Sequence, residues 1–507
     1  MVAFNPTELP PGSPSSLEDV SGEAWVPLYE HDCPFDDKVF FQVMRNLIRN
    51  PNLNSSWLFR ADILLEASGP EGAKEHDGSE HLRPRTVHFQ DYAIENTLIR
   101  KLIPRNTKRD QPMDQTCLSY RRLSSSEEIK SLVVYKPHID NPADMPFYHP
   151  RVKALAFHHE WNSSTETGRI SIHYNFFDDY EGDAKLGRTA YHLLSTLHKH
   201  GLGTLAGYVK RVQHDTIVPQ TTVQNTYARL KEKYARALID SWAEVTDPDK
   251  HVFEDLSIAA FLIKLWAQIY GTSPFPGFVD IGCGNGLLVY ILRQEGYAGW
   301  GFDARMRKSW DNYQDRAKET EIIAGQPVLQ QRVLLPCIIG DGGEPTAENS
   351  GPEQESDLPM QQGTDGILHD GRFPEGTFII SNHADELTPW TPILAAISNC
   401  PFLMIPCCSH ALSGAKFRAP PPKGQGKSPS AYSSLVDWVT SIGTECGWVI
   451  EKEMLRIPST RNTGLIGRTR TSPAKEIDLN GLVARYGGTA GYLENVMQLA
   501  TTAPRGH

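Results

Sequence analysis

Apolar and polar positions change their spacing along the chain, and each spacing predicts a different element. At 169–177, β-branched and aromatic residues alternate with smaller polar ones, which is typical of a strand. In the segment 225–242, apolar residues recur every four positions and predict a helix with one apolar face: Leu230, Tyr234, Leu238 and Trp242. Helices are also predicted at 189–197 and 253–270.

From Phe278 onward, short apolar segments follow one another with helical stretches between them. Strands are predicted at 278–281, 300–303, 333–339, 378–381 and 402–405, and a helix at 287–294. Strands that alternate with helices imply a parallel sheet with crossover connections. We therefore expect an α/β chain in which a Rossmann-like domain, with a parallel-rich sheet flanked by helices, follows a mixed α+β N-terminal region.

Changes in composition set the expected domain boundaries. Residues 1–25 are rich in Pro, Ser, Glu and Gly and are expected to be disordered. The mixed region is expected at 26–245, the Rossmann-like domain at 246–480, and a C-terminal helix and tail at 481–507. Two insertions interrupt the second domain: an acidic loop at 341–366, with seven acidic and no basic residues, and a basic proline-rich loop at 413–431.

Composition narrows the class of protein. The 507 residues are 39% hydrophobic and 22% charged, as in globular proteins, and no apolar run approaches the roughly 20 residues that cross a bilayer. The N-terminal residues do not resemble a secretory signal, and the eight cysteines fit no disulfide framework, so a reducing cytosolic or nuclear compartment is expected. The net charge of −11 argues against broad polyanion binding but allows a local basic patch.

A glycine-rich turn separates the predicted strand 278–281 from the helix after it. Gly282, Gly284 and Gly286 allow positive φ angles and a close approach of a ligand to the backbone, while the helix N-terminus offers free N–H groups. Asp280 precedes the turn, and Asp303 ends the next strand, where an acid accepts hydrogen bonds from ribose hydroxyls. A tight turn without a ligand is the alternative, and the two acids make it the weaker one.

The glycine spacing distinguishes between two kinds of ligand. Dinucleotide sites use G-x-G-x-x-G, which places a pyrophosphate on the helix N-terminus. This chain has G-x-G-x-G with Asp280 two positions before the first glycine, and a carboxylate there repels a pyrophosphate but attracts an ammonium group. The turn, which includes Asn285, is therefore predicted to bind S-adenosyl-L-methionine rather than NAD, as in motif I of the class I methyltransferases, which it resembles.

Polar residues follow the predicted strand 378–381 and would lie beside a transferred methyl group. Asn382 is predicted to hydrogen-bond the cofactor or the substrate. His383, Asp385 and Glu386 are candidates to orient or deprotonate a hydroxyl acceptor, with Asp385 or His383 as the assisting base. The alternative is that an acid caps the helix that begins near Leu387 and that His383 is an ordinary interior group.

Cysteines end the predicted strand 402–405. Cys407 and Cys408 are adjacent, which does not match the C-x₂₋₄-C spacing of zinc ligands, so no metal is predicted. We expect a buried, reduced pair that lines the site, and a thiol that carries the methyl group stays open.

Several longer motifs together resemble one family. They are Thr189–Trp242, Lys250–Asp255 with the apolar residues 259–262 that follow, Asp280–Gly286, Asn382–Trp390, Ile405–Cys408 and Leu455–Asn462. The chain resembles, over about 190–475, the tRNA (uracil-2′-O)-methyltransferase family of class I methyltransferases, which modifies serine tRNA in the cytoplasm of eukaryotes. The resemblance implies methylation of a uridine ribose 2′-hydroxyl, with S-adenosyl-L-methionine as cofactor and tRNA as partner.

The resemblance also implies functions for particular residues of this chain. It implies cofactor binding by Asp280, Gly282, Gly284, Asn285, Gly286 and Asp303, and substrate-side roles for Asn382, His383, Asp385 and Arg461. Beyond the resemblance, Asn382 is also expected to bind the cofactor, and Arg456 and Lys416 the substrate. Some relatives carry a C-terminal CCCH zinc finger, but this chain has no cysteine after Cys446, so RNA contacts must come from elsewhere.

Two basic segments agree with an RNA partner. Residues 452–475 hold six basic residues and one acid, and residues 100–109 hold five basic residues and no acid. Two other readings stay open: a methyltransferase for a protein or small molecule, which needs no basic surface, and a non-catalytic scaffold that has kept the fold.

Overall fold

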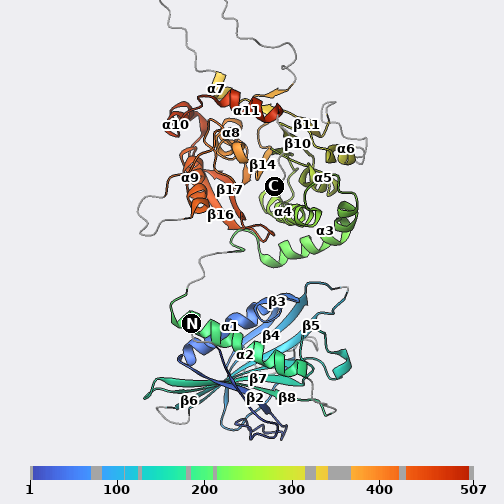
Figure 1. Cartoon of the computed structure of the whole chain (residues 1–507), viewed down its shortest axis with the longest axis vertical. Coiled ribbons are helices and arrows are strands. Elements are labelled where there is room, and N and C mark those ends of the chain that lie inside the picture. The colour runs from blue at the N-terminus through green and yellow to red at the C-terminus, as the bar shows by residue number, and fades with distance from the viewer. Residues whose placement is uncertain are drawn as a thin grey trace, which may run out of the picture. The chain divides into compact units, whose positions relative to one another are not determined.

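The chain divides into two compact units, Met1–Lys210 and Arg211–His507. The computed structural model describes residues 4–69, 83–107, 109–123, 128–178, 184–208, 214–314, 327–340, 367–421 and 430–501. Figure 1 shows a broad sheet crossed by α1 and α2 in the first unit, and a sheet between helices in the second.

The first unit is built on one antiparallel sheet of eight strands in the order β1-β2-β8-β7-β6-β5-β4-β3. The strands are β1 (Thr7–Glu8), β2 (Val26–Cys33), β3 (Leu58–Ser68), β4 (Ala93–Pro104), β5 (Met113–Leu123), β6 (Glu128–Pro137), β7 (Ala154–Asn162) and β8 (Thr167–Asn175). The helices are α1 (Asp37–Arg49) and α2 (Ala184–Leu205), with single 3₁₀ turns η1 (Pro51–Leu53) and η4 (Pro142–Asp144).

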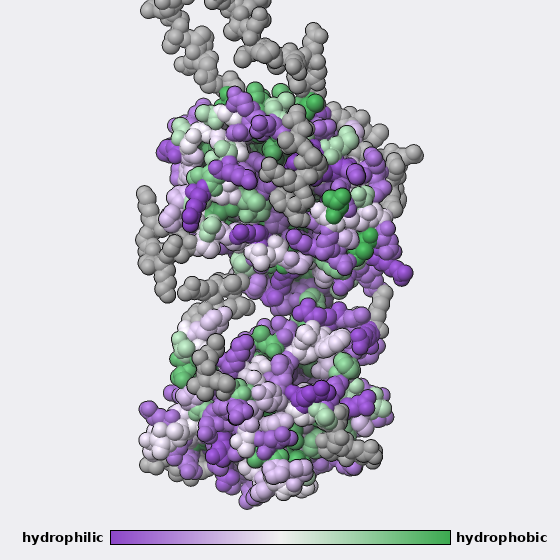
Figure 2. Space-filling view, in the orientation of Figure 1, coloured by the Kyte–Doolittle hydropathy of each residue, from purple (hydrophilic) through white to green (hydrophobic). Residues whose placement is uncertain are grey.

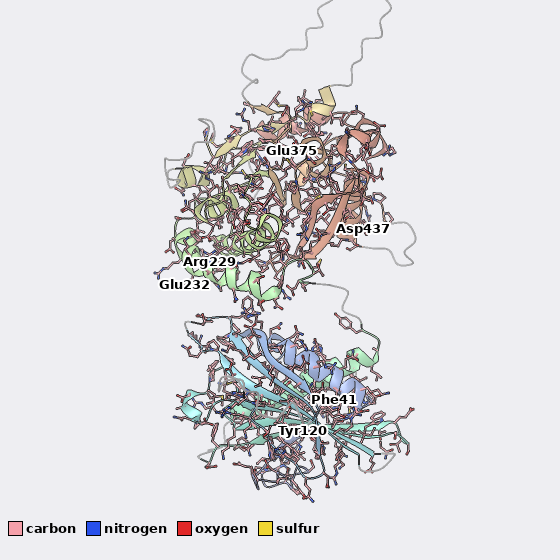
Figure 3. All side chains as sticks on the ribbon, turned by 180° about the vertical axis from the view of Figure 1, so that it is seen from behind. Phe41, Tyr120, Arg229, Glu232, Glu375 and Asp437 are labelled. Carbon is pink, nitrogen blue, oxygen red and sulfur yellow. The ribbon has the colours of Figure 1, made fainter. Side chains whose placement is uncertain are left out.

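Apolar side chains pack on both faces of this sheet, because successive residues of a strand point to opposite faces and both sets are apolar here. On β6, Val133 and Tyr135 pack toward α1 and α2, whereas Leu132 and Val134 pack on the opposite face. That opposite face also carries Tyr120 of β5 (Figure 3), whose hydroxyl donates to the carbonyl of Val87 at 2.6 Å.

The N-terminal segment covers the face that no helix covers. Leu17 and Trp25 are only 4% and 3% exposed and pack in the same cluster as Leu132 and Val134. The prediction of disorder over 1–25 is therefore wrong for residues 4–25. A Pro- and Ser-rich segment can be ordered by a few apolar residues when these pack on an apolar face of a sheet.

Three buried histidines should make the first unit sensitive to acid. Burial lowers the pKa of His158 and of His173 to about 3 and that of His149 to about 4. The unfolded chain therefore binds more protons than the folded unit below about pH 6.5, so stability falls as the pH falls from there toward 3. Between pH 7 and pH 5 each histidine should remove about 2 kcal/mol of unfolding free energy.

Differential scanning calorimetry of the first unit's transition at pH 7, 6 and 5 measures this loss. His158→Gln can keep the bonds to Ser16 and Tyr92. It should lower the number of protons taken up on unfolding by about one, so the unfolding free energy should fall less steeply with decreasing pH. Substitution of the exposed His192 in α2 by glutamine should leave it unchanged. A melting temperature that stays constant from pH 7 to pH 5 contradicts the argument.

The second unit is built on a mixed sheet of seven strands in the order β11-β10-β9-β14-β15-β17-β16. The strands β9 (Phe278–Ile281), β10 (Gly299–Asp303), β11 (Leu329–Gln331), β14 (Phe378–Asn382) and β15 (Phe402–Ile405) are parallel. The strands β16 (Trp448–Met454) and β17 (Thr463–Arg470) join them in antiparallel pairs. This confirms the predicted Rossmann-like, parallel-rich sheet.

Helices cover both faces of this sheet. The first face packs on α3 (Gln220–Asp240), α4 (Pro248–Tyr270) and α5 (Leu287–Gln294). The second face packs on α8 (Thr391–Ser398), α9 (Ala431–Glu445), α10 (Leu479–Arg485) and α11 (Tyr492–Thr501). The sheet order reverses direction at β9, which lies between β10 and β14, and such a switch point opens a crevice at the carboxyl ends of the strands.

The unit boundary differs from the predicted one at 245/246. Leu230 and Leu238 of α3 are buried in one cluster with α4 and α5. Arg229 of α3 (Figure 3) also bonds to the carboxylate of Glu295 directly after α5, as do the hydroxyl of Tyr234 and the ammonium of Lys233. The helix α3 therefore belongs to the second unit, and the boundary lies at 210/211.

Two further predicted elements differ in detail. The predicted strand 333–339 is only β12 (Val333–Leu334), paired with β13 (Leu368–His369) in a separate sheet, and α7 (Cys337–Gly340) follows it. Pro336 has no N–H to donate to a strand and begins the helical turn instead. The expected C-terminal helix is the pair α10 and α11, interrupted at Gly487 and Gly488, which have φ angles of 103° and 71°.

The remaining short elements and the insertions complete the unit. A short helix, α6 (Ser309–Gln314), follows β10, and the 3₁₀ turns η5 (Asp385–Leu387) and η6 (Ala474–Glu476) follow β14 and β17. The predicted acidic insertion 341–366 lies outside the described residues, as do residues 422–429 of the predicted basic loop. Among the described helices, none is both long enough and apolar enough to span a bilayer.

Candidate active site

The predicted glycine turn connects β9 to α5, and its backbone needs glycine for two reasons. Gly282, Gly284 and Gly286 have φ angles of 74°, 51° and 77°, in the left-handed region that favours glycine. A Cβ at Gly282 would lie 3.0 Å from the Cβ of Ala384, and one at Gly286 would lie 2.6 Å from Cδ1 of Leu329. The turn is therefore held close to the loop that follows β14 and to Leu329 of β11, and neither position has room for a Cβ.

A cavity of about 480 Å³ opens at this edge of the sheet. Most of the predicted site residues line it: Asp280, Gly282, Gly284, Asn285, Asp303, Asn382, His383, Asp385, Glu386 and Arg461. Gly286, Arg456 and Lys416 are not among the lining residues. Predicted residues that follow three different strands therefore lie around one cavity. The volume is in the range that holds a small organic ligand or cofactor.

Asp280 is the most deeply buried acid of the cavity. It is 1% exposed, and its Oδ1 has no hydrogen-bond partner among the described residues. Burial, followed by the charges of Asp255 and Asp303, raises the pKa of Asp280 well above its usual range. A buried carboxylate without a partner is costly, so this position favours a ligand that brings positive charge.

Asp255 extends the acidic cluster from α4. Its Oδ1 accepts a hydrogen bond from Nδ2 of Asn382 at 3.3 Å. Burial and the neighbouring charge of Glu254 raise the pKa of Asp255 to about 8, and the bond from Asn382 offsets part of this rise. The cavity floor thus holds several carboxyl groups that raise one another's pKa values.

Asp303 has a different environment, although it also lies at the cavity. Its Oδ2 accepts from the N–H of Gly284 at 3.1 Å, and its Oδ1 accepts from the N–H of Arg305 at 3.0 Å. Each carboxylate oxygen has a second lone pair, so Asp303 can still accept hydrogen bonds from a ligand. Asn285 bonds within the turn, where its Oδ1 accepts from the N–H of Leu287 at 2.9 Å.

The loop after β14 is held in an unusual backbone conformation. His383 and Asp385 have φ angles of 53° and 42°, which non-glycine residues rarely adopt and which cost about 1–3 kcal/mol each. Nε2 of His383 lies 3.0 Å from Oε1 of Glu254, which anchors the loop to α4. Burial raises the pKa of Glu254, but the bond and charge of His383 outweigh burial and leave it below its usual value.

The thiol of Cys407, directly after β15, donates to Oδ1 of Asp385 at 2.8 Å. Burial, followed by the charge of Asp385, raises the pKa of Cys407 far above its usual range, so the sulfur keeps its proton. Asp385, Cys407 and Cys408 also lie close enough together to hold a metal ion. Glu386 instead faces the ring of His410, whose Nε2 lies 3.6 Å from its Oε1.

Comparison with known proteins agrees with this geometry. Residues 6–211 match the family described as "TRM44-like, N-terminal bet v1-like domain", and residues 217–324 match "Predicted AdoMet-dependent methyltransferase". Over 98% of its own length and of the relative's, the chain is 55% identical to a tRNA (uracil-O(2)-)-methyltransferase of Neurospora crassa. Proteins of the same name from Schizosaccharomyces pombe and Yarrowia lipolytica are 40% and 37% identical over 96% and 99% of this chain, and over 95% and 100% of their own lengths.

The chain belongs to the tRNA (uracil-O(2)-)-methyltransferase family. Membership confirms the resemblance seen in the sequence motifs. The match of residues 6–211 to the bet v1-like domain extends this resemblance into the N-terminal unit. Among solved structures, a magnesium protoporphyrin IX methyltransferase of Synechocystis aligns with 52% of this chain and all of its own, at 16% identity and a TM-score of 0.24.

S-adenosylmethionine, the cofactor of this methyltransferase domain, fits the residues present. Its ammonium and sulfonium groups would favour the ionised forms of Asp280 and Asp255, and its ribose hydroxyls can donate to a carboxylate of Asp303 that still has lone pairs. Carboxyl groups directly beneath the turn would disfavour the pyrophosphate of a dinucleotide. The prediction of S-adenosylmethionine rather than NAD is confirmed.

Cofactor binding to this family member should release a proton. Asp255, with a pKa of about 8, is mostly protonated at pH 7, and a positively charged ligand favours its ionised form. Affinity should therefore increase with pH until about pH 8. Calorimetric titration at pH 7 in buffers with different ionisation enthalpies measures the release, and Asp255→Asn should reduce it. A binding enthalpy that does not depend on the buffer contradicts this expectation.

Two predicted substrate residues lie elsewhere in this member of the family. The guanidinium of Arg456 pairs with the carboxylate of Asp215 through Nε at 3.0 Å and Nη2 at 2.6 Å. Lys416 is exposed and forms an isolated backbone bridge with His410. Arg461 does line the cavity, and its guanidinium lies 4.6 Å from the centre of the Tyr432 ring. Only Arg461 is therefore kept as a substrate-binding candidate.

Glu453 of β16 holds residues 215–217, near the start of the second unit, against the sheet. This carboxylate is 2% exposed and accepts from the N–H groups of Asp215, Thr216 and Ile217 at 2.7, 2.8 and 2.9 Å. Glu453→Gln would replace one acceptor oxygen by an amide that faces N–H donors. We expect it to lower the unfolding free energy of the second unit by about 2–3 kcal/mol, which urea unfolding would measure.

A neighbour on the same strand provides the control for Glu453. Glu451 pairs with Arg468 at the surface, so Glu451→Gln should cost less than about 1 kcal/mol. Equal effects of the two substitutions would contradict the special role of the buried carboxylate.

Two residues of the cavity, Glu254 and Asp255, were not singled out as site residues from the sequence. Both are buried on α4, and the available signal was two adjacent acids shortly before its apolar residues 258–263. Buried acids need a partner or a ligand, so their position in this helix indicated a site.

Proposed function

We propose that this chain transfers the methyl group of S-adenosylmethionine to the ribose 2′-hydroxyl of a uridine in tRNA, with serine tRNA as substrate in the cytoplasm. The unpartnered carboxylate of Asp280, at the bottom of a cavity that three strand ends enclose, supports it most directly. The names of full-length relatives support the choice of tRNA and of a uracil nucleotide.

When bound, S-adenosylmethionine supplies an electrophilic methyl group. Asp280 and Asp255 hold its positive charges, and Asp303 with Gly284 holds the ribose side, so the chain contributes mainly orientation. Asn382 bonds to Asp255 and lines the cavity, which places it to fix the position of either reactant.

Asp385 is our candidate for the base that takes the proton of the attacking hydroxyl. His383 is engaged by Glu254 through Nε2, and its Nδ1 is buried, so we assign it a positioning role. Glu386 faces His410, and burial raises its pKa. The carboxylate of Asp385 is half-buried at the cavity and accepts a hydrogen bond from the thiol of Cys407 at Oδ1, so it has further lone pairs with which to accept from a substrate hydroxyl.

Incubation with methyl-labelled S-adenosylmethionine and total tRNA, followed by mapping of the modified nucleotides, tests the proposal. Ribose-methylated uridine in serine tRNA is expected. Label on base carbons or nitrogens would refute the acceptor, and label in another tRNA would refute only the serine assignment. A protein or small-molecule methyltransferase would bind the cofactor without labelling tRNA, and a scaffold would not bind the cofactor.

A further inference from the structure

Two exposed aromatic rings meet on the surface of the first unit. Trp57, just before β3, is 43% exposed, and Phe147, in the loop before β7, is 51% exposed. Their ring centres lie 5.4 Å apart in an edge-to-face arrangement. Two large apolar rings that share a contact and remain in solvent offer flat surfaces to a ligand.

Cationic side chains from two other elements surround these rings. The guanidinium of Arg109 lies 4.8 Å from the centre of the Trp57 ring and 5.7 Å from that of Phe147. The ammonium of Lys185, in the first turn of α2, lies 3.8 Å from the centre of the Phe147 ring. Arg105 is exposed beside them, and Asp144 is the exposed acid nearest to Phe147 in sequence.

The register of the sheet fixes this arrangement. Leu58 pairs with Pro104 across β3 and β4, which brings Trp57 beside Arg105, and the N–H of Arg105 donates to the carbonyl of Trp57 at 2.9 Å. Leu58 and Tyr148, the neighbours of the two rings in sequence, are buried in one cluster. The rings are thus held on a rigid base before any ligand arrives, which lowers the entropic cost of binding.

We infer that Trp57, Phe147, Arg105, Arg109 and Lys185 form a stacking surface for unpaired nucleotides of tRNA. Bases stack on aromatic rings and on guanidinium planes, and the cations neutralise the phosphates between them. Since the chain as a whole carries a net charge of −11, this local concentration of positive charge is where a polyanion would be attracted. The inference rests on the proposed function and names the part of the chain that holds the substrate.

The full chain and an unmodified serine tRNA transcript provide the test. Fluorescence anisotropy over a range of salt concentrations should show that Trp57→Ala and Phe147→Ala each weaken tRNA binding about tenfold. Arg109→Ala should also reduce the slope of log affinity against log salt by about 1. Single-stranded oligouridylate should compete for this surface better than an RNA duplex of equal length.

Controls in the same unit separate this surface from general effects. Tyr208→Ala removes another exposed ring, and Arg169→Ala removes a cation that faces Glu30 and Asp32; both should bind tRNA as the native chain does. Trp57→Phe should restore binding to within about threefold. In methylation assays the alanine variants should raise KM for tRNA and leave kcat and S-adenosylmethionine affinity unchanged.

The outcomes distinguish this inference from the proposed function. Failure of the native chain to bind or methylate tRNA would refute the proposed function itself. If the native chain methylates tRNA but the Trp57 and Phe147 variants bind it equally well, only the stacking surface is refuted. If the variants change the melting temperature but not the tRNA affinity, the two rings only stabilise the fold. That outcome would also refute the stacking surface.

Discussion

Asp280→Asn should weaken S-adenosylmethionine binding by at least about 30-fold. Truncation of one member of a buried charge pair costs about 2–5 kcal/mol, and asparagine keeps the shape of the side chain while it removes the charge. Calorimetric titration of the variant measures the loss. Asp311→Asn, which neutralises an exposed acid on α6, should retain the native affinity.

The same substitution should raise the melting temperature of the cofactor-free second unit. Burial beside Asp255 and Asp303 raises the pKa of Asp280, so folding at pH 7 must either bury its charge or protonate it. Both cost free energy, and a neutral amide avoids that cost. Each kcal/mol gained corresponds to about 2–4 °C for a unit of this size. A lower melting temperature, or unchanged cofactor affinity, would mean that Asp280 has a structural role instead.

Asp385→Asn should lower kcat for tRNA methylation by about 10²–10³-fold while cofactor affinity changes little. Loss of a positioned base typically removes 10²–10⁴-fold of rate, and an asparagine can still accept the thiol of Cys407, so the loop should keep its conformation. Single-turnover assays at saturating tRNA and S-adenosylmethionine measure the chemical step directly.

Two further variants serve as controls for the effect of Asp385→Asn on kcat. Asp370→Asn alters an exposed acid of the same unit and should leave kcat unchanged. Glu386→Gln tests the competing acid in the same loop. If Glu386→Gln abolishes turnover while Asp385→Asn retains it, the assignment of the base is reversed.

The second unit was predictable where its signals are local. The turn Asp280–Gly286 joins a buried strand to a helix within a few residues, and the glycine spacing alone limits what the backbone can do. The converging strand ends followed from the alternation of strands and helices. The N-terminal sheet was harder to predict, because much of its second face is covered by Leu17 and Trp25, which lie in a segment with a disorder-like composition.

The rest of the site depends on contacts between distant parts of the chain. Glu254 reaches His383 across 129 positions, and Asp215 reaches Arg456 across 241. Neither partner is visible from the other's local sequence, so the sequence did not show that Arg456 is paired with Asp215. Long-range pairing determines which charged residues remain available for a ligand.

The carboxyl groups beneath the glycine turn link the stability of the second unit to the concentration of the methyl donor. Binding of the methyl donor stabilises the folded domain by an amount that grows with the logarithm of the free donor concentration, so its folded fraction and resistance to proteolysis should follow the cell's methyl-donor level. Transfer also removes the sulfonium charge, so the demethylated cofactor compensates less of the negative charge of these carboxyl groups than the methylated one. The same carboxylates that attract the donor therefore help to expel what remains of it.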